Sequence, residues 1–369
     1  MKNERKNDIQ NGMISSRQTL RLYVFDLMGI ATLLLPPYLA KLCGTSGIYA
    51  ILLGTGLGVL YLLYLGWIMK KMGTDLLSYL QKEVPMWIGK PVLLFVLLHS
   101  VWTAGFCGYV FANLMQYSLV KETSYLVILL LIVAVAAYAV SGGIESRARV
   151  YEVLFWFILL PYISMMLAAV RNFEWAYVEP VLQPQSENIG KGMYLVFLLL
   201  TPLFFSLFLI GEKEKNYGRN IIKTIGMSVL FSAGILLGSY VLLLGTFGTN
   251  ALAGLRFPVV TLMSTIQFEG NFLKRMDALM LAVWFFTLFA LLNLHLHYGV
   301  QMMGGLFRNR KRKRMWWQLA LPTLAVLVIA YAMHRETRML ALFLEYYSYV
   351  AVPCMVIVPG VLLLVRRRS

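Results

Sequence analysis

Apolar runs of about 20 residues recur along the whole chain, and short segments carrying most of the charged residues separate them. A helix rises about 1.5 Å per residue, so each run can cross roughly 30 Å of hydrocarbon. Backbone amides and carbonyls cannot face lipid unpaired, so each run must be a helix. We therefore expect about ten transmembrane helices, near residues 18–41, 46–70, 91–119, 124–141, 150–171, 190–210, 219–246, 276–302, 315–333 and 338–365.

Composition supports an all-α membrane protein. Hydrophobic residues make up 59% of the chain and charged residues 14%, whereas a soluble domain carries about 25% charged residues. No segment alternates like a strand of an outer-membrane barrel. We expect one transmembrane domain, 18–365, between short tails at 1–17 and 366–369. The net charge of +16 is spread between the apolar runs, so we expect no nucleic-acid partner.

The charges between the runs predict the orientation of the chain. One set of alternate loops holds 23 Lys and Arg residues and the other holds 9, with Arg147 and Arg149 counted in the richer set. Loops rich in Lys and Arg stay in the cytoplasm, so both termini are expected there. The longer loops 172–189 and 247–275 then lie outside. The basic run 308–314 is expected inside, in contact with lipid headgroups.

Two helices are interrupted at corresponding places. The first span contains Gly29 and a Pro36-Pro37 pair, and the sixth contains Thr201-Pro202. Gly29 and Thr201 each lie 11 residues into their spans, roughly 16 Å at helical rise and close to the bilayer midplane. Five spans separate the two helices, which gives the halves opposite orientations. This pattern predicts a 5+5 inverted repeat, 18–171 and 190–365, with broken first and sixth helices, although prolines also kink ordinary membrane helices.

A ligand pocket is expected where these breaks meet the third and eighth spans. Freed amides and carbonyls at broken helices can hold a small charged ligand at the midplane. Residues at i, i+3, i+4 and i+7 share a helical face, and one such face of the third span and one of the eighth are expected to line the pocket. The candidate ligand-binding residues are Gly29, Ile30, Ala31, Thr32, Leu33, Leu98, Val101, Trp102, Gly105, Leu199, Thr201, Pro202, Phe205, Trp284, Thr287 and Leu288.

Few other residues suggest chemistry. Asp26 lies within the first span and is a candidate proton or cation site; the alternatives are a carboxylate that faces the inner aqueous side or pairs with Arg21. His99 could face the central cavity, but most buried polar groups simply find a partner. His295 and His297 lie about 200° apart around a helix, so they cannot share a metal. No catalytic signature occurs, and we expect no enzyme, metal or cofactor.

Two stretches resemble a known family. SSRQTLRLYVFDLMGIATLLLPPYLAK, followed by GTSGIYAILLGTGLG, is similar to the N-terminal signature of the endospore germination permeases. FPVVTLMSTIQFEGNFLKRMDALMLAVWFF resembles the region before and into their eighth span, with Arg275-Met276-Asp277 and then Trp284. These proteins are the B subunits of nutrient germinant receptors, in the amino acid–polyamine–organocation superfamily. Members of the superfamily often carry two or more glycines at the first-helix break, where this chain has only Gly29.

The resemblance implies a role and partners. A B subunit binds a small nutrient, often an amino acid, in the spore inner membrane, which is the bacterial cytoplasmic membrane. It works with a larger membrane A subunit and a lipoprotein C subunit, and ligand binding triggers germination. Three functions stay open at this point: a sensing receptor subunit, an amino-acid transporter of the same fold, and a membrane enzyme. The enzyme is the weakest, because no catalytic set is present.

Overall fold

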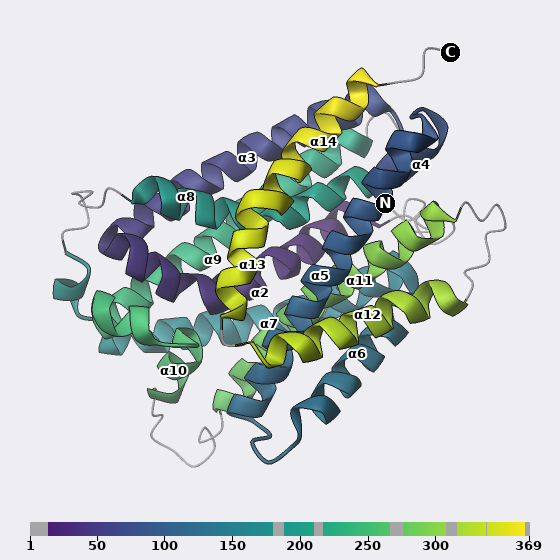
Figure 1. Cartoon of the computed structure of the whole chain (residues 1–369). Coiled ribbons are helices and arrows are strands. Elements are labelled where there is room, and N and C mark those ends of the chain that lie inside the picture. Colours follow the sequence, from purple (N-terminus) through teal and green to yellow (C-terminus); the bar gives the residue numbers. More distant parts are fainter. Residues whose placement is uncertain are drawn as a thin grey trace, which may run out of the picture.

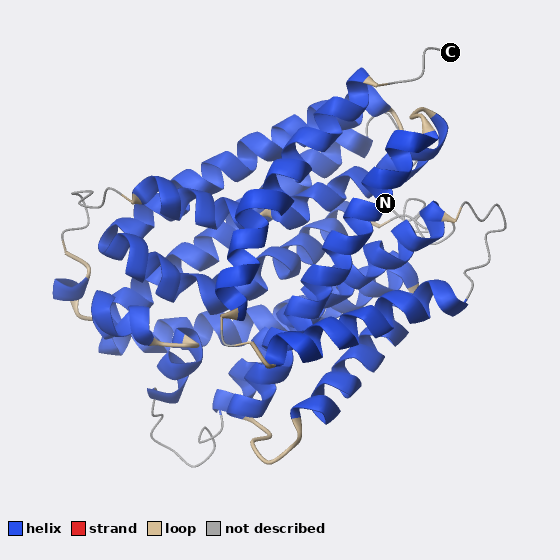
Figure 2. Ribbon diagram, viewed as in Figure 1, coloured by secondary structure: helices blue, strands red, loops and turns tan. Residues whose placement is uncertain are grey.

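The structure is a computed structural model that describes residues 14–179, 188–209, 217–265, 276–307, 316–336 and 338–365. Every regular element in these ranges is a helix (Figure 2). Several expectations lie outside the described residues: most of the N-terminal tail, the C-terminal tail, the basic run 308–314 and Arg275. Parts of the two expected outer loops, 180–187 and 266–275, lie outside them as well.

The described helices pack into one bundle (Figure 1). The first half contains α2 Ser16–Cys43, η1 Gly44–Ser46, α3 Gly47–Met72, α4 Leu76–Lys82, α5 Met86–Ser118, α6 Tyr125–Ser141, α7 Gly143–Ala169, η2 Val170–Asn172 and η3 Trp175–Tyr177. The second half contains α8 Ile189–Leu198, η4 Thr201–Phe208, α9 Tyr217–Gly254, α10 Pro258–Thr265, α11 Met276–Leu306, α12 Trp316–His334, α13 Met339–Tyr346, η6 Tyr347–Ala351 and α14 Val352–Leu364.

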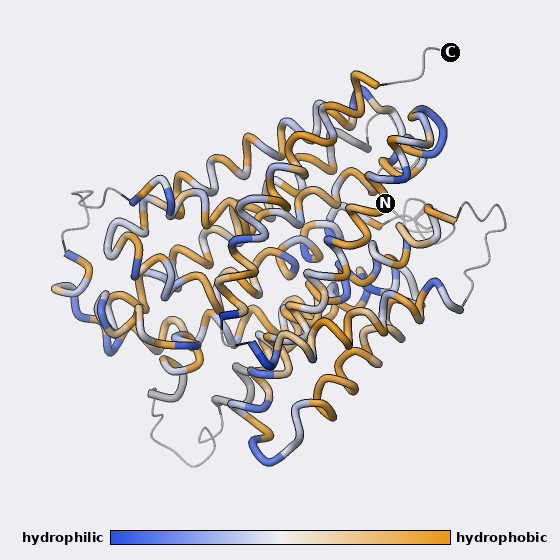
Figure 3. Tube along the Cα trace, viewed as in Figure 1, coloured by the Kyte–Doolittle hydropathy of each residue, from blue (hydrophilic) through white to orange (hydrophobic). Residues whose placement is uncertain are grey.

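These elements account for the ten expected spans. Eight stretches of the described chain are long and apolar enough to cross a membrane by length and composition. The first of them, Ser16–Met72, contains two helices, because Gly44 ends α2 with φ of +54° and a short 3-10 turn leads into α3. The helix α6 is apolar throughout but slightly shorter, at 17 residues. Hydrophobic residues accordingly cover the middle of the bundle (Figure 3).

The packing of the helices is reciprocal between the two halves. The first span, α2, contacts the seventh, α9, and the second span, α3, contacts the sixth, α8. The third span, α5, contacts the ninth, α12, while the eighth span, α11, contacts the fourth, α6. The central pair, α5 and α11, contact each other. Exchanging the halves reproduces each contact, which is the arrangement expected of an inverted repeat of five helices.

The short helix α4 and the C-terminal helix lie at one end of the bundle. The hydroxyl of Tyr79 on α4 donates to the carbonyl of Leu362 at 3.4 Å, and Gln81 donates to the carbonyl of Gly305 at 3.3 Å. Because ten helices cross, α2 must begin at this same end. The N-terminal end of α2 and the C-terminal end of α14 therefore lie at the same end of the bundle, and the side of the membrane that this end faces is a prediction from the charges.

The expected break in the first helix is wrong. The helix α2 runs without interruption from Ser16 to Cys43, with Pro36 and Pro37 inside it. The two prolines remove two amide donors, but the remaining hydrogen bonds keep the backbone helical. The sixth span does break: α8 ends at Leu198, and a 3-10 helix begins at Thr201. The bundle therefore has one broken helix of the expected pair.

Two further boundaries differ from expectation. The fifth span begins at Gly143 and not near residue 150, so Arg147 lies inside a helix and not in a loop. The tenth span consists of α13, one turn of π-helix at Tyr347–Ala351, and α14, which contains Pro353 and Pro359. A π-turn inside a helix frequently marks a functional site. Both differences bear on the candidate site.

Candidate functional site

A buried ion pair joins three helices near the middle of the bundle. The guanidinium of Arg147 on α7 donates to the carboxylate of Asp26 on α2, and also to the carbonyl of Ala290 on α11 at 3.0 Å. Asp26 is 2% exposed and Arg147 is 4% exposed. Removing one member of such a pair leaves the other charge buried without a partner, which is strongly destabilising. The pair therefore fixes the positions of α2, α7 and α11 relative to one another.

This pair corrects two sequence-based interpretations. Asp26 does not pair with Arg21, which donates to the backbone carbonyl of Glu152 at 2.9 Å. Asp26 does not face the inner aqueous side either, because it is buried against Arg147. Arg147 was counted among the inner loop charges, and it is instead buried. Removing one charge from the 23 leaves the asymmetry between the loops, so the expected orientation does not depend on it.

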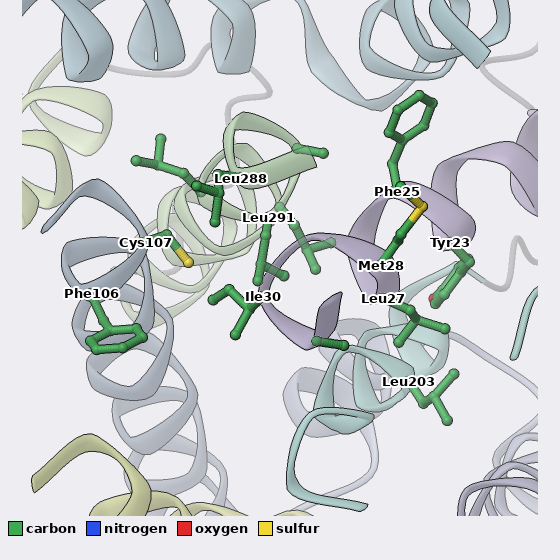
Figure 4. Close-up of a cluster of buried hydrophobic side chains, with 14 of the residues drawn as sticks. Tyr23, Phe25, Leu27, Met28, Ile30, Phe106, Cys107, Leu203, Leu288 and Leu291 are labelled. Atoms are coloured by element: carbon green, nitrogen blue, oxygen red, sulfur yellow. The ribbon is translucent and has the colours of Figure 1, made fainter. Parts of the chain in front are cut away.

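A small cavity lies beside Asp26, where the sixth span is broken. Its volume is about 20 Å³, roughly the space that one water molecule needs. Figure 4 shows Leu27 and Ile30 projecting from α2, and Leu291 from α11, among the buried side chains around it. The lining residues are Asp26, Leu27, Ile30, Ala31, Thr103, Leu199, Thr201, Pro202, Leu291, His295, Phe343 and Tyr347. A cavity of this volume is too small for an amino acid.

Polar groups on three other helices gather on one side of the cavity. Thr103 of α5 and Tyr347 of η6 share a hydrogen bond of 2.9 Å between their hydroxyls. The ring of His99 lies 5.6 Å from that of His295, and Nδ1 of His99 is 3.1 Å from the hydroxyl of Tyr346. These residues bring α5, α11 and the tenth span together around the break in the sixth.

Several of these buried groups keep a hydrogen-bonding atom without a partner in the described residues. They include Oδ2 of Asp26, Nε2 of His99, Nδ1 of His295 and Oγ of Ser206. Most buried polar atoms in proteins are paired, so a cluster of unpaired ones requires an explanation.

Five of the nine residues predicted in the first and sixth spans line the cavity. Ile30, Ala31, Leu199, Thr201 and Pro202 do so directly. The other four, Gly29, Thr32, Leu33 and Phe205, do not line it. A side chain added at Gly29 would approach Thr287 to 3.0 Å, so Gly29 allows α2 to pack closely on α11.

The remaining predicted residues of the first, sixth and eighth spans are buried around the cavity without lining it. Trp284 donates from Nε1 to the hydroxyl of Thr32 at 3.4 Å. Phe205 stacks on Tyr298 with ring centroids 4.4 Å apart. Leu33 and Leu288 are fully buried.

The four residues predicted from the third span do not line the cavity. Leu98 is 60% exposed on the outer surface of the bundle. A side chain at Gly105 would meet Ile329 of α12, so Gly105 serves helix packing. Trp102 contacts Tyr346 at 5.8 Å between ring centroids, and Val101 lies near Gly299. The helix α5 is apolar on almost every side, so spacing alone did not identify the face that points inward.

A second signal was available for α5 and α11. The polar residues His99 and Thr103 lie one turn apart and are both fully buried. On α11, Leu291 and His295 are likewise one turn apart and line the cavity. Intramembrane polar residues usually face the bundle interior. That rule, used in place of the spacing of apolar residues, points to His99, Thr103 and His295. It gives no indication of Phe343 or Tyr347.

The fold is that of small-molecule transporters. A Na⁺-coupled sialic acid symporter in a substrate-bound, outward-open state superposes with a TM-score of 0.64 at 10% identity, over 95% of this chain and 77% of the symporter. A nucleobase–cation symport-1 family transporter, closed with bromovinylhydantoin bound, gives a TM-score of 0.69 at 12% identity, over 94% of this chain and 77% of the transporter. At these identities the similarity concerns the fold alone.

The sequence places the chain within a family. The family described as spore germination protein matches residues 13–339, so the chain belongs to it. Spore germination protein B2 of Bacillus subtilis is 26% identical over 278 residues, 72% of each chain. Spore germination protein KB of the same organism is 24% identical over 323 residues, 85% of this chain and 84% of the relative. Spore germination protein A2 is 21% identical over 298 residues, 79% of this chain and 81% of the relative.

The resemblance found in the sequence is thus confirmed at the level of the family. The chain is an integral membrane protein with a role in nutrient sensing or transport. The family and the structural relatives are of receptor or transporter type and not enzymes.

Proposed function

We propose that this chain is the nutrient-sensing subunit of a spore germinant receptor. It binds a small nutrient, an amino acid or a molecule of similar size and polarity, in the midplane cavity beside Asp26. It passes the signal to a membrane A subunit and a lipoprotein C subunit. It lies in the spore inner membrane with both termini in the cytoplasm, and it needs no cofactor.

The observation that carries this proposal is the cavity at the break of the sixth span. It combines an apolar lining, which suits an aliphatic side chain, with the carboxylate of Asp26 and the imidazole of His295. Ligand sites are mostly apolar pockets with a few convergent polar groups. In the fold of the two structural relatives, such sites lie at the bilayer midplane beside interrupted helices.

Ligand entry requires the cavity to grow, and the structure suggests which parts would move. The backbone is irregular at Leu199 and Leu200, between α8 and η4, and again at the π-turn Tyr347–Ala351. Leu199 in the first segment and Tyr347 in the second both line the cavity. Movement of α8 and α13 about them opens the cavity, while the continuous helix α2 and its ion pair stay in place.

Closure around the nutrient is then the signal. A ligand shifts an equilibrium only by its difference in affinity between the open and closed states. A 100-fold difference corresponds to about 2.7 kcal/mol, enough to bias a two-state receptor without a transport cycle.

The second candidate is an amino-acid transporter of the same fold. The similarity to two transporters favours it, and one of them is described as Na⁺-coupled. The ion pair argues for the sensor, because Arg147 already neutralises Asp26 and bonds to the carbonyl of Ala290. A coupling cation at Asp26 would have to displace this guanidinium, whose removal leaves a buried charge unpaired.

Binding and uptake by the same purified protein in liposomes distinguish the two. Radiolabelled alanine is one suitable probe in a panel of amino acids. The sensor predicts saturable binding without accumulation inside the liposomes. Saturable accumulation that depends on an ion gradient and is lost in Asp26→Asn would establish the transporter. If no amino acid in the panel binds, amino acids are excluded as the ligand of this protein.

A further inference from the structure

A second site lies far from the midplane cavity, where α3, α4 and α14 meet at the end of the bundle that carries the chain termini. Here the surface forms an open groove of about 620 Å³, within the usual size range of ligand pockets, roughly 300–1,000 Å³. One wall belongs to α3, with Tyr64, Trp67 and Lys71. The other belongs to α14, from Ile357 to Leu364.

Hydrogen bonds from tyrosine hydroxyls hold the two walls of the groove together. Tyr64 donates to the carbonyl of Val356 at 2.9 Å, and Tyr61 donates to that of Met355 at 3.2 Å. Tyr79 on α4 donates to the carbonyl of Leu362 at 3.4 Å, which closes the groove at its end. Gly360 lets the helices approach, because a side chain there would lie 2.6 Å from the hydroxyl of Tyr64.

The two walls of the groove differ in chemistry. On α3 the ammonium of Lys71 lies 4.0 Å from the ring of Trp67, which is itself 49% exposed. On α14 the exposed lining is aliphatic, with Ile357, Val361 and Leu364 at 59%, 45% and 86% exposure. Lysine and tryptophan are typical of the membrane–water interface, and aliphatic side chains of the hydrocarbon.

We propose that this groove binds an anionic phospholipid, with the phosphate at Lys71 and an acyl chain along Ile357 and Val361. Lys71 forms no ion pair in the described residues, so its charge is available to a phosphate. Trp67 and Tyr79 lie at the level of the glycerol.

The length of the groove favours a lipid over a helix of a partner protein. Its walls extend over eight residues of each helix, Tyr64 to Lys71 and Ile357 to Leu364, which is about 10 Å at helical rise. This is about a third of the hydrocarbon thickness. A transmembrane partner helix would need a continuous groove through the bilayer, whereas a headgroup and the first part of an acyl chain fit this length.

Fluorescence quenching in liposomes tests the proposal on the full-length chain. The protein is reconstituted in phosphatidylcholine with a small fraction of lipid brominated on the acyl chain, either phosphatidylglycerol or phosphatidylcholine. The signal of Trp67 is the difference between wild type and Trp67→Phe. We expect stronger quenching by the anionic lipid, corresponding to about fivefold enrichment, the ratio that about 1 kcal/mol per cation gives.

Two variants and a matched control identify the groove. Lys71→Gln is expected to make the two lipids quench equally. Val361→Phe fills the groove without changing its charge and is expected to reduce quenching by both lipids. Lys90→Gln removes an exposed lysine at the start of α5, outside the groove, and is expected to keep the enrichment. Equal quenching by both lipids in wild type, or enrichment that survives Lys71→Gln, would overturn the proposal. Protection of Trp67 from both lipids in wild type would overturn it as well, because it would show that no lipid occupies the groove.

Discussion

Arg147 and Asp26, on the fifth and first transmembrane helices, form an ion pair that is almost completely buried. The pair lies beside the cavity at the break of the sixth span, and its arginine also holds the backbone of the eighth. A charged pair at this depth costs desolvation energy on both sides, so it contributes more to position than to stability. It is the natural starting point for testing the site.

Breaking the pair should be costly, and replacing both members should not be. We expect Arg147→Met to lower the free energy of unfolding by about 3–5 kcal/mol, since Asp26 is left buried without its partner. Asp26→Leu combined with Arg147→Met should recover most of this loss. Unfolding of the purified protein in detergent, followed in increasing denaturant, measures both. Arg149→Gln is the control, because Arg149 is exposed and bonds only to Glu145 in the described chain. A double variant as unstable as Arg147→Met would contradict the pairing.

Close packing of α2 on α11 depends on the absence of a side chain at Gly29. Gly29→Val would bring its side chain against Thr287, whose backbone cannot move without displacing α11. We expect a loss of about 1–3 kcal/mol in stability, as for other overpacked cores. Gly56→Ala on α3 is the matched control, because an added methyl group there meets nothing within 4 Å. Equal thermal stability of the two variants would show that the contact at Gly29 can relax.

The orientation of the bundle is open to direct measurement. The charge asymmetry predicts that Glu174, in the segment after η2, lies outside, and that Lys90, at the start of α5, lies inside. A membrane-impermeant maleimide added to intact cells should label Glu174→Cys and leave Lys90→Cys unlabelled until the membrane is opened. Both residues are exposed, so differences in burial do not affect the comparison. Labelling of Lys90→Cys from outside would reverse the orientation.

The sequence was sufficient to predict the number and order of the helices, because the bilayer requires long apolar runs and Lys121 and Glu122 separate α5 from α6. It was not sufficient for the first helix. Proline was read there as a break, yet the missing hydrogen bonds at Pro36 and Pro37 are too few to unwind 28 residues. The break at Thr201 was predicted correctly from the same signal. Whether a proline breaks its helix depends on the helices that pack around it, and a local stretch of sequence does not show those neighbours.

The site residues were predictable only where the backbone pattern located them. Ile30, Ala31 and Thr201 followed from the two proline segments and line the cavity. Arg147 was missed, since it follows Gly142-Gly143 and Glu145 in a stretch that resembles an inner loop. Its burial depends on Asp26, which is 121 residues away in sequence. Such a pair can be inferred only when an intramembrane acid is matched against every basic residue near a helix end.

Filling the cavity should abolish the response to nutrient without unfolding the protein. Ala31 lines the cavity, and Ala31→Leu adds three carbon atoms to a space of about 20 Å³ beside Asp26. We expect nutrient binding by the purified protein to fall at least tenfold and the germination response of spores to be lost. The reason is that the closed, signalling state can no longer form around a ligand.

Two comparisons make this test specific to the cavity. Leu98→Phe changes a side chain on the outer face of α5 and is expected to leave binding and germination unchanged, since Leu98 is 60% exposed. Thr103→Val keeps the volume of its side chain but removes the hydroxyl that bonds Tyr347 at 2.9 Å, and it should weaken binding without blocking the space. Protein levels in the spore membrane are measured for each variant. Normal binding by Ala31→Leu, at normal protein level, would place the nutrient elsewhere in the chain or in a partner subunit.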